Sequence, residues 1–504
     1  MQRKFNLTFL LIIFSFTLIY CELPEKKNFH IYILLGDKKM TQDDLFAQGK
    51  YPLSRCYILN EKLQWNSTEN IPKTETNEPL GLGYHFAEKM LVQNKDISIG
   101  LILNAGKDTP INLWGGKTKP FREARKACKK GMQSGTLKGV LWRSNTNLTN
   151  YPIALDYLKD LVAGLRKDTR LLDLPFVIAE LSDSTAFNSQ IGALSEDVHH
   201  IGIAPINKAI DPVLKKVSLA MLGNLYAEQM QSLNRKIDSN PMTTKPSVPV
   251  IDCHIHAQSV SPNGLDRVYQ WMKRNNVEKC ITHPLSSSKA KDKAEYEQML
   301  KNFEKYKGKI FRFCLVEPGE FNDLDKLVIH LKKEVQYGAI GMGEHYGKNL
   351  MFDDPKNLMI YEACQKVNLP VMFHIDKNKN MDEKGLPRVE KVLQMFPKCK
   401  LLAHASWWRH FSDGTCDRLM EKYDNLYADV SAITGILNRD RKKTRAFIIK
   451  HADRVLFNTD AGWWSFNKHE NDRELEFQIF EKLNLPEKIK EKVYRNNAKA
   501  LFGF

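Results

Sequence analysis

The sequence predicts two α/β domains in one chain, an open sheet with helices on both faces followed by an eight-stranded (β/α)8 barrel. Two observations lead to this prediction. At 504 residues the chain is too long for one ordinary core. Short apolar, β-favouring runs also alternate with helix-length segments, and eight such units follow one another from Val248 onward.

The composition is that of a globular protein, with 10% aromatic and 27% charged residues. A net charge of +16 is spread along both halves of the chain. We therefore expect attraction to acidic glycans or surfaces and no nucleic-acid partner. Nine cysteines in a chain of this length do not make a disulfide framework, and several lie in strand-like runs. We expect few or no structural disulfides.

Residues 1–21 have the pattern of a secretory signal peptide. Arg3 and Lys4 precede an apolar run from Phe9 to Tyr20 that is short for a membrane span. A retained signal anchor is the alternative, and the bulky Tyr20 argues against a lipoprotein cleavage site before Cys21. We expect a secreted or periplasmic protein whose mature chain has no transmembrane span.

The first domain is predicted to cover residues 24–235 and the second residues 248–504. Residues 236–247 are polar, contain prolines and lack an apolar period, so they are predicted to be a linker. In the first domain, strands are expected at 29–36, 97–103, 139–142 and 174–179, and helices at 83–92, 151–166 and 212–231. In the barrel, strands are expected at 248–257, 277–282, 309–316, 338–344, 370–375, 400–404, 425–430 and 454–460, and helices at 264–275, 291–307, 324–336, 358–367 and 385–396.

Histidines and carboxylates stand at the ends of five predicted barrel strands. His254 and His256 are two apart on the first strand, so both side chains leave on one face. The others end strands four, five, six and eight: Glu344, His374, His404 and Asp460. The ends of barrel strands converge on one cavity, and imidazole and carboxylate are ligands of Zn²⁺. The pattern predicts a site for a divalent metal.

Two short blocks in the first domain resemble known catalytic motifs, but each lacks a catalytic residue of its motif. Gly36–Met40 resembles a Gly-Gln-Ser-Asn-Met block with Lys38 in place of serine, and Asp211–Leu214 resembles Asp-x-x-His with Leu214 in place of histidine. The domain thus resembles the SGNH-type carbohydrate esterases of the sialate O-acetylesterase family, which implies a three-layer α/β fold. A hydroxyl nucleophile needs a neighbouring base. Since both members of the couple are missing, we expect an inactive domain that binds a glycan or a partner.

The barrel carries the blocks Asp252–His256, Phe457–Asp460 and Asn497–Gly503. They resemble Asp-x-His-x-His, Phe-Gly-Thr-Asp and Asn-Ala-x-x-Leu-Phe-Gly of the amidohydrolase superfamily, in its amidohydrolase-related branch. The substitution of Asn458 for the usual glycine does not touch a ligand. The resemblance implies one or two divalent ions, with zinc the first choice. His254, His256, His374 and Asp460 would hold a first ion or share it with a second, and His404 would bind the second ion or the substrate. Asp460 would be the general base and then the proton donor.

The sequence does not decide the roles of Glu344 and of four tryptophans near the predicted site. Glu344 either bridges two metal ions or binds substrate or a helix terminus beside a single ion. Four tryptophans follow strands six and eight and either rim the cavity, where they would bind a flat apolar face of the substrate, or cover the barrel edges. These are Trp407, Trp408, Trp463 and Trp464.

The leading hypothesis is an exported metal-dependent hydrolase. Its substrate would be a small carbonyl compound, namely a lactone, ester or amide, sugar-derived ones included. One alternative is a metal-dependent decarboxylase in the same barrel, and another is a non-catalytic glycan-binding protein.

Overall fold

The structure is a computed structural model that describes residues 23–36, 40, 53–70, 81–104, 114, 118–143, 151–182, 184–213, 217–239, 246–285, 289–431, 433–462 and 474–504. The chain divides into two compact units, one of residues 1–151, 174–188 and 202–234, the other of residues 152–173, 189–201 and 235–504. The predicted signal segment lies outside the described residues. No helix in the described part is long and apolar enough to cross a membrane.

The N-terminal sheet has seven strands in the order β3-β2-β4-β1-β5-β6-β7. Strands β1, β2, β4, β5 and β6 pair in parallel, and β3 joins β2 antiparallel. The strands are β1 (Phe29–Gly36), β2 (Cys56–Leu59), β3 (Trp65–Ser67), β4 (Ser98–Leu103), β5 (Thr136–Arg143), β6 (Phe176–Ala179) and β7 (Ile201–Ala204). The helices of this part of the chain are α1 (Gly81–Gln93), α2 (Lys119–Ser134), α3 (Tyr151–Thr169), α4 (Thr185–Asp197) and α5 (Leu219–Asp238).

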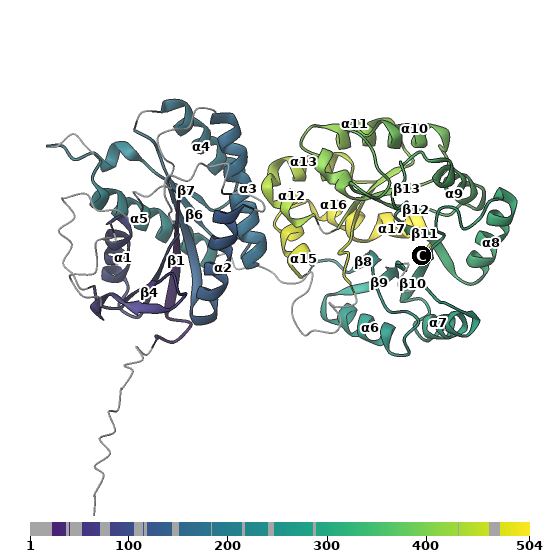
Figure 1. The fold of residues 1–504 in the computed structure, drawn as a ribbon, viewed down its shortest axis with the longest axis horizontal. Coiled ribbons are helices and arrows are strands. Elements are labelled where there is room, and N and C mark those ends of the chain that lie inside the picture. The colour runs from purple at the N-terminus through teal and green to yellow at the C-terminus, as the bar shows by residue number, and fades with distance from the viewer. Residues whose placement is uncertain are drawn as a thin grey trace, which may run out of the picture. The chain divides into compact units, whose positions relative to one another are not determined.

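Helices cover both faces of this sheet, because side chains of β1 alternate between them. Tyr32 and Leu34 belong to a buried cluster with α1 and α5. Ile31 points the other way, toward Gly131 of α2. The predicted three-layer α/β architecture is confirmed (Figure 1).

The second sheet contains eight strands in sequence order, β8 to β15, and the pairings along it are parallel. It closes into a barrel because the His256 N–H donates to the Ala461 carbonyl at 2.7 Å and the Asp460 N–H to the His254 carbonyl at 2.9 Å. The strands are β8 (Val250–Ile255), β9 (Val277–Thr282), β10 (Ile310–Cys314), β11 (Ala339–His345), β12 (Val371–Ile375), β13 (Leu401–Ala405), β14 (Leu426–Val430) and β15 (Val455–Phe457).

Helices surround the barrel strands (Figure 1). Three successive helices, α7, α8 and α9, begin at an aspartate whose side chain accepts a backbone N–H of the first turn, as expected of an N-cap: Asp292, Asp323 and Asp354. The helices are α6 (Gly264–Arg274), α7 (Lys293–Lys305), α8 (Leu324–Gln336), α9 (Pro355–Val367), α10 (Pro387–Met395), α11 (Thr415–Lys422), α12 (Thr434–Arg439), α13 (Arg441–Lys450), α15 (Glu474–Glu481), α16 (Glu487–Glu491) and α17 (Asn497–Phe502).

All eight predicted barrel strands are present, so the (β/α)8 barrel is confirmed. Several elements of the first domain differ from the prediction, and α2, α4 and β7 are present in addition to the predicted ones. The helix expected at 212–231 begins only at Leu219, because Asp211 and Val213 form a turn in which the aspartate side chain accepts the Val213 N–H. The β2–β3 hairpin was not predicted. The eight cysteines in the described part of the chain are free and buried, in agreement with the expectation of few disulfides.

Candidate metal centre

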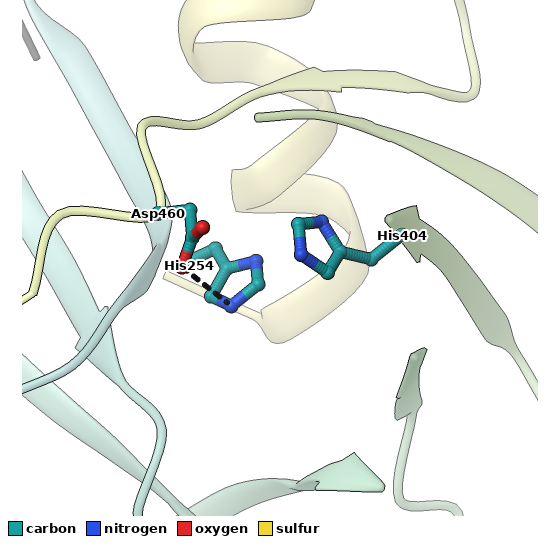
Figure 2. Close-up of side chains that lie close together, drawn as sticks. All are labelled: His254, His404 and Asp460. Carbon is teal, nitrogen blue, oxygen red and sulfur yellow. Dashed lines mark ion pairs between the residues drawn. The ribbon is translucent and has the colours of Figure 1, made fainter. Parts of the chain in front are cut away.

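The six side chains predicted to bind metal meet at one end of the barrel. They form three overlapping groups in which the donor atoms lie within 4.8 Å of one another. The groups are His254, His256 and Glu344; Glu344, His374 and His404; and His254, His404 and Asp460. Figure 2 shows the last group, with His254 and Asp460 on one side and His404 facing them from β13.

The first donor group, His254, His256 and Glu344, lies beside Asp460 of the third group. His254 Nε2 and His256 Nε2 are 3.3 Å apart, as expected for side chains two residues apart on one face. His256 Nε2 lies 3.2 Å from Glu344 Oε2 and 3.2 Å from Asp460 Oδ1. His254 Nε2 lies 3.5 and 3.7 Å from the same two oxygens.

The second donor group uses the other oxygen of Glu344. Oε1 lies 2.5 Å from His374 Nδ1 and 3.7 Å from His404 Nε2. Glu344 thus stands between the two groups with one oxygen directed at each. Its own position depends on Gly343, which has φ +131°, and whose added Cβ would lie 2.5 Å from the Met372 carbonyl oxygen. Only glycine lets β11 pass so close to β12 at this point.

The donor set fits a divalent cation of the zinc type. Four ligands at about 2.0–2.1 Å in a tetrahedron lie roughly 3.3 Å from one another. His254 Nε2, His256 Nε2 and Glu344 Oε2 are 3.2 to 3.5 Å apart, and Asp460 Oδ1 lies 3.2 and 3.7 Å from the two histidine nitrogens. Neutral imidazole and carboxylate are the donors that such ions prefer.

Each site histidine has its rear nitrogen on a hydrogen-bond acceptor, as metal-binding histidines usually do. His254 Nδ1 lies 2.7 Å from Asp429 Oδ2, and His256 Nδ1 lies 3.0 Å from the His283 carbonyl oxygen. His374 Nε2 lies 3.2 Å from Asp376 Oδ2. His404 Nδ1 lies 2.9 Å from Ser431 Oγ.

The carboxylates of the centre are ionised. Burial acts to raise the pKa of Glu344, but hydrogen bonds with His254, His256 and His374 outweigh it and hold the pKa well below its usual value. The pKa of Asp460 is lowered in the same way, by a hydrogen bond with His256 and the nearby histidine charges. Without a metal, burial acts to lower the pKa of His256, yet Asp460 and Glu344 raise it to about 9. The centre therefore attracts positive charge.

The mouth of the centre lies on the side of His374 and Asp460. Their side chains are 17% and 22% exposed, whereas that of Glu344 is 2% exposed. Tyr346 is half-buried beside them, and its hydroxyl donates to Glu344 Oε2 at 2.7 Å. Lys379 lies over the Tyr346 ring at 4.4 Å. A substrate would meet these side chains first.

Sequence reasoning missed several residues of the centre: Tyr346, Asp376, Asp429 and Ser431. A signal for Asp429 was present, because it interrupts the apolar run of the seventh barrel strand. Asp429 and Ser431 are 0% exposed. A charged side chain is seldom buried so completely without a partner.

Of the two roles left open for the tryptophans, a cavity rim or a cover of the barrel edges, the burial of Trp407 and Trp408 favours the second. Trp407 and Trp408 lie in the short 3-10 helix η6 (Ser406–His410) and are 0% and 2% exposed. The Trp408 ring packs on Phe411 and Phe447, and its Nε1–H donates to the Asp429 carbonyl at 2.7 Å. Both indoles belong to the core between barrel and helices, because the turn after β13 directs them inward. Trp463 and Trp464 lie outside the described residues.

The predicted esterase positions are only partly described. Lys38 and Leu214 lie outside the described residues. Asp211 is described, and its Oδ1 accepts the Val213 N–H at 2.8 Å. Gly36, two residues before Lys38, has φ +109°. An added Cβ there would lie 1.9 Å from the Arg143 carbonyl oxygen, so β1 and β5 come very close at their ends. Glycine is required at this position whether or not the domain is active.

Fold and site together define a (β/α)8 barrel with a buried histidine–carboxylate centre of the metal-binding type. Residues 286–504 match the amidohydrolase family. Residues 28–232 match the carbohydrate esterase family of sialic acid-specific acetylesterases. These matches confirm both resemblances predicted from the sequence motifs. The first begins after β8 and β9, so His254 and His256 join the centre on geometry rather than through the match.

No curated protein matches the chain. Similar solved structures include an amidohydrolase from Burkholderia multivorans with bound zinc, at 12% identity and a TM-score of 0.38, covering 51% of this chain and 100% of that one. A TIM-barrel protein from Bordetella bronchiseptica has 14% identity and a TM-score of 0.39, covering 51% and 98%. A carbohydrate acetylesterase from Xanthomonas citri has 12% identity and a TM-score of 0.30, covering 45% and 60%. All three likenesses are distant.

Proposed function

We propose that this chain is an exported metal-dependent hydrolase that cleaves a C–O or C–N bond of a small carbonyl compound in its barrel. One observation carries the proposal. The two oxygens of Glu344 face two separate donor groups, with His256 Nε2 at 3.2 Å from one and His374 Nδ1 at 2.5 Å from the other. A single carboxylate shared in this way suits a bridge between two cations, so we take the centre to be binuclear.

Asp460 is the residue best placed to move protons. It is the most exposed carboxylate of the donor groups, and its lowered pKa keeps it ionised at neutral pH. A bound divalent cation would supply two things here, a lowered pKa of a coordinated water and polarisation of the substrate carbonyl. Asp460 takes one proton from the attacking water as the new C–O bond forms. It then gives that proton to the departing alcohol or amine as the old bond breaks.

A further histidine, His283, lies close to the centre but takes no part in the proposed proton transfer. Behind the donors, His283 lies against the His254 ring at 4.7 Å, its Nε2–H donates to the Cys253 carbonyl oxygen at 2.7 Å, and its Nδ1 has no hydrogen-bond partner among the described residues. Burial, and next the neighbouring His254 and His256, hold the pKa of His283 well below its usual value. His283 is therefore neutral and supports the donors by packing rather than by proton transfer.

The N-terminal domain is proposed to be a binding domain. Lys38 and Leu214 stand where a serine nucleophile and a histidine base would be needed. A leucine cannot accept a proton, so the couple that activates a hydroxyl is missing. The domain would keep the esterase scaffold and hold the barrel near a glycan-derived substrate. Residues 1–21 would direct the chain out of the cytoplasm.

The test is a chelation and reconstitution series on the purified full chain. Lactones, sugar esters and amides are assayed by acid release before chelation, after exhaustive chelation, and after addition of Zn²⁺ or Mn²⁺. We expect activity that disappears on chelation and returns with metal. Activity that survives chelation would overturn the proposal. Carbon dioxide release from cyclic or aromatic acids, without hydrolysis of the panel, would instead identify a decarboxylase.

A further inference from the structure

A buried hydrogen-bond network lies behind the donor atoms and is built around Asp429 of β14. Asp429 Oδ2 lies 2.7 Å from His254 Nδ1 and accepts the Ser431 hydroxyl at 2.8 Å. His404 Nδ1 lies 2.9 Å from Ser431 Oγ and 3.1 Å from Asp429 Oδ2. The rear nitrogens of two histidines, one from β8 and one from β13, thus meet at a single carboxylate.

The front nitrogens of the same two histidines face opposite oxygens of Glu344. His254 Nε2 lies 3.5 Å from Oε2, and His404 Nε2 lies 3.7 Å from Oε1. A hydroxyl has one hydrogen. Because Ser431 gives it to Asp429, the Ser431 oxygen is left to accept from His404 Nδ1–H. Both imidazoles then carry their proton at the rear, and each Nε2 lone pair is free for a cation.

Asp429 is itself held from the other side. Asn458 Nδ2 donates to Asp429 Oδ1 at 2.7 Å, and Asn458 Oδ1 accepts the Cys253 N–H at 2.7 Å. Asn458 occupies the second place of Phe457–Asp460, where the motif that this block resembles has glycine. A glycine has no side chain to make either bond. The asparagine therefore ties the carboxylate to β8, the strand that carries His254.

We propose that Asp429 is the positioning residue that fixes the tautomer and direction of His254 and, directly as well as through Ser431, of His404, and that Asn458 locks Asp429 in that role. One carboxylate would then tune a ligand on each side of Glu344. The inference rests on the proposed function, because it takes both histidines to be metal ligands.

The test is a Co²⁺ titration of the metal-free full chain, followed by visible absorption and by competition with a chelator. Asp429→Asn keeps the size of the side chain and removes its charge. We expect it to weaken both equivalents of Co²⁺ by about 10- to 100-fold, the usual cost of losing an outer partner of a ligand, and to change the absorption bands. Ser431→Ala should weaken the equivalent that His404 binds, and by less than Asp429→Asn does, because His404 Nδ1 still faces Asp429 Oδ2 at 3.1 Å. Asn458→Gly should weaken both equivalents by part of the Asp429→Asn effect.

Asp376→Asn is the matched control. Asp376 also lies behind a site histidine, 3.2 Å from His374 Nε2, but it touches that histidine alone and is 28% exposed. Its variant should leave the Co²⁺ equivalent at His254 unchanged. Thermal melting of each metal-free variant checks folding, and if Asp429→Asn does not fold, Ser431→Ala and Asn458→Gly decide.

Two results would overturn the inference, and only the second would also overturn the proposed metal centre. If the wild type binds Co²⁺ and the three network variants bind it equally well with unchanged spectra, Asp429 has no positioning role and the proposed function stands. If the wild type binds no Co²⁺, the metal centre and this inference both fall.

Discussion

Glu344 Oε2 lies 3.2 Å from His256 Nε2, while the other oxygen of the same carboxylate is turned toward a different strand. This contact joins β8 to β11 across the mouth of the barrel. It explains how a pair of histidines that is a weak signal by itself becomes part of a centre. The contact also couples the protonation of His256 to the binding of a cation, because a protonated imidazole cannot be a ligand.

Metal affinity should therefore rise with pH. In the metal-free protein the pKa of His256 is raised to about 9, from a usual value of 6.5. Because the folded pKa is the higher one, the ion pairs of protonated His256 stabilise the metal-free fold fully below pH 6.5, and this contribution is lost as pH rises toward 9. A cation competes with the same proton. The melting temperature of the chelated protein should fall from pH 6.5 to 9 while the increase caused by Zn²⁺ grows. A metal-induced increase that shrinks over this range would contradict the assignment of His256 as a ligand.

Tyr346→Phe should weaken metal binding without unfolding the protein. The variant removes the hydroxyl that donates to Glu344 Oε2 at 2.7 Å, while the ring keeps its place 5.1 Å from the His374 ring. A hydrogen bond to a charged group is worth about 1.5–3 kcal/mol, so we expect a roughly tenfold or greater loss of affinity in chelator competition. Tyr361→Phe is the matched control, because Tyr361 is fully buried and its hydroxyl has no hydrogen-bond partner among the described residues. Equal affinities in the two variants would show that Tyr346 does not support Glu344.

Trp408→Phe tests whether Trp408 belongs to the core and not to the rim of the cavity. The indole N–H donates to the Asp429 carbonyl at 2.7 Å, and the ring is 2% exposed. Loss of a buried hydrogen bond and of ring volume should lower the free energy of unfolding by about 1–3 kcal/mol. Denaturant unfolding measures this change. The KM of a substrate found in the hydrolysis screen should stay near the wild-type value. A raised KM with unchanged stability would restore the rim.

The barrel could be predicted because each of its strands is a buried apolar run bounded by polar residues. The fifth barrel strand is a representative case, because it was predicted at 370–375 and is observed at Val371–Ile375. The β2–β3 hairpin could not be predicted in the same way. Its strands, Cys56–Leu59 and Trp65–Ser67, have four and three residues, too few for an alternating pattern to stand out.

The residues of the candidate metal centre were predictable because each is a polar side chain at or near the end of an apolar, strand-like run. Asp429 was missed because Val430 follows it, so the strand does not end there. Sequence position also could not show which way Trp407 and Trp408 turn. That direction is set by packing of η6 against α11 and α13, which no local pattern contains.

Metal content per chain distinguishes a centre of two metal ions bridged by Glu344 from a centre with a single ion. Elemental analysis is made on the purified full chain after loading with Zn²⁺ and removal of excess ion, beside Glu344→Gln. We expect two equivalents of metal in the wild type and at most one in the variant. An unchanged stoichiometry in Glu344→Gln would rule out the bridge. A wild type that holds no metal would contradict the proposal of a metal-dependent hydrolase.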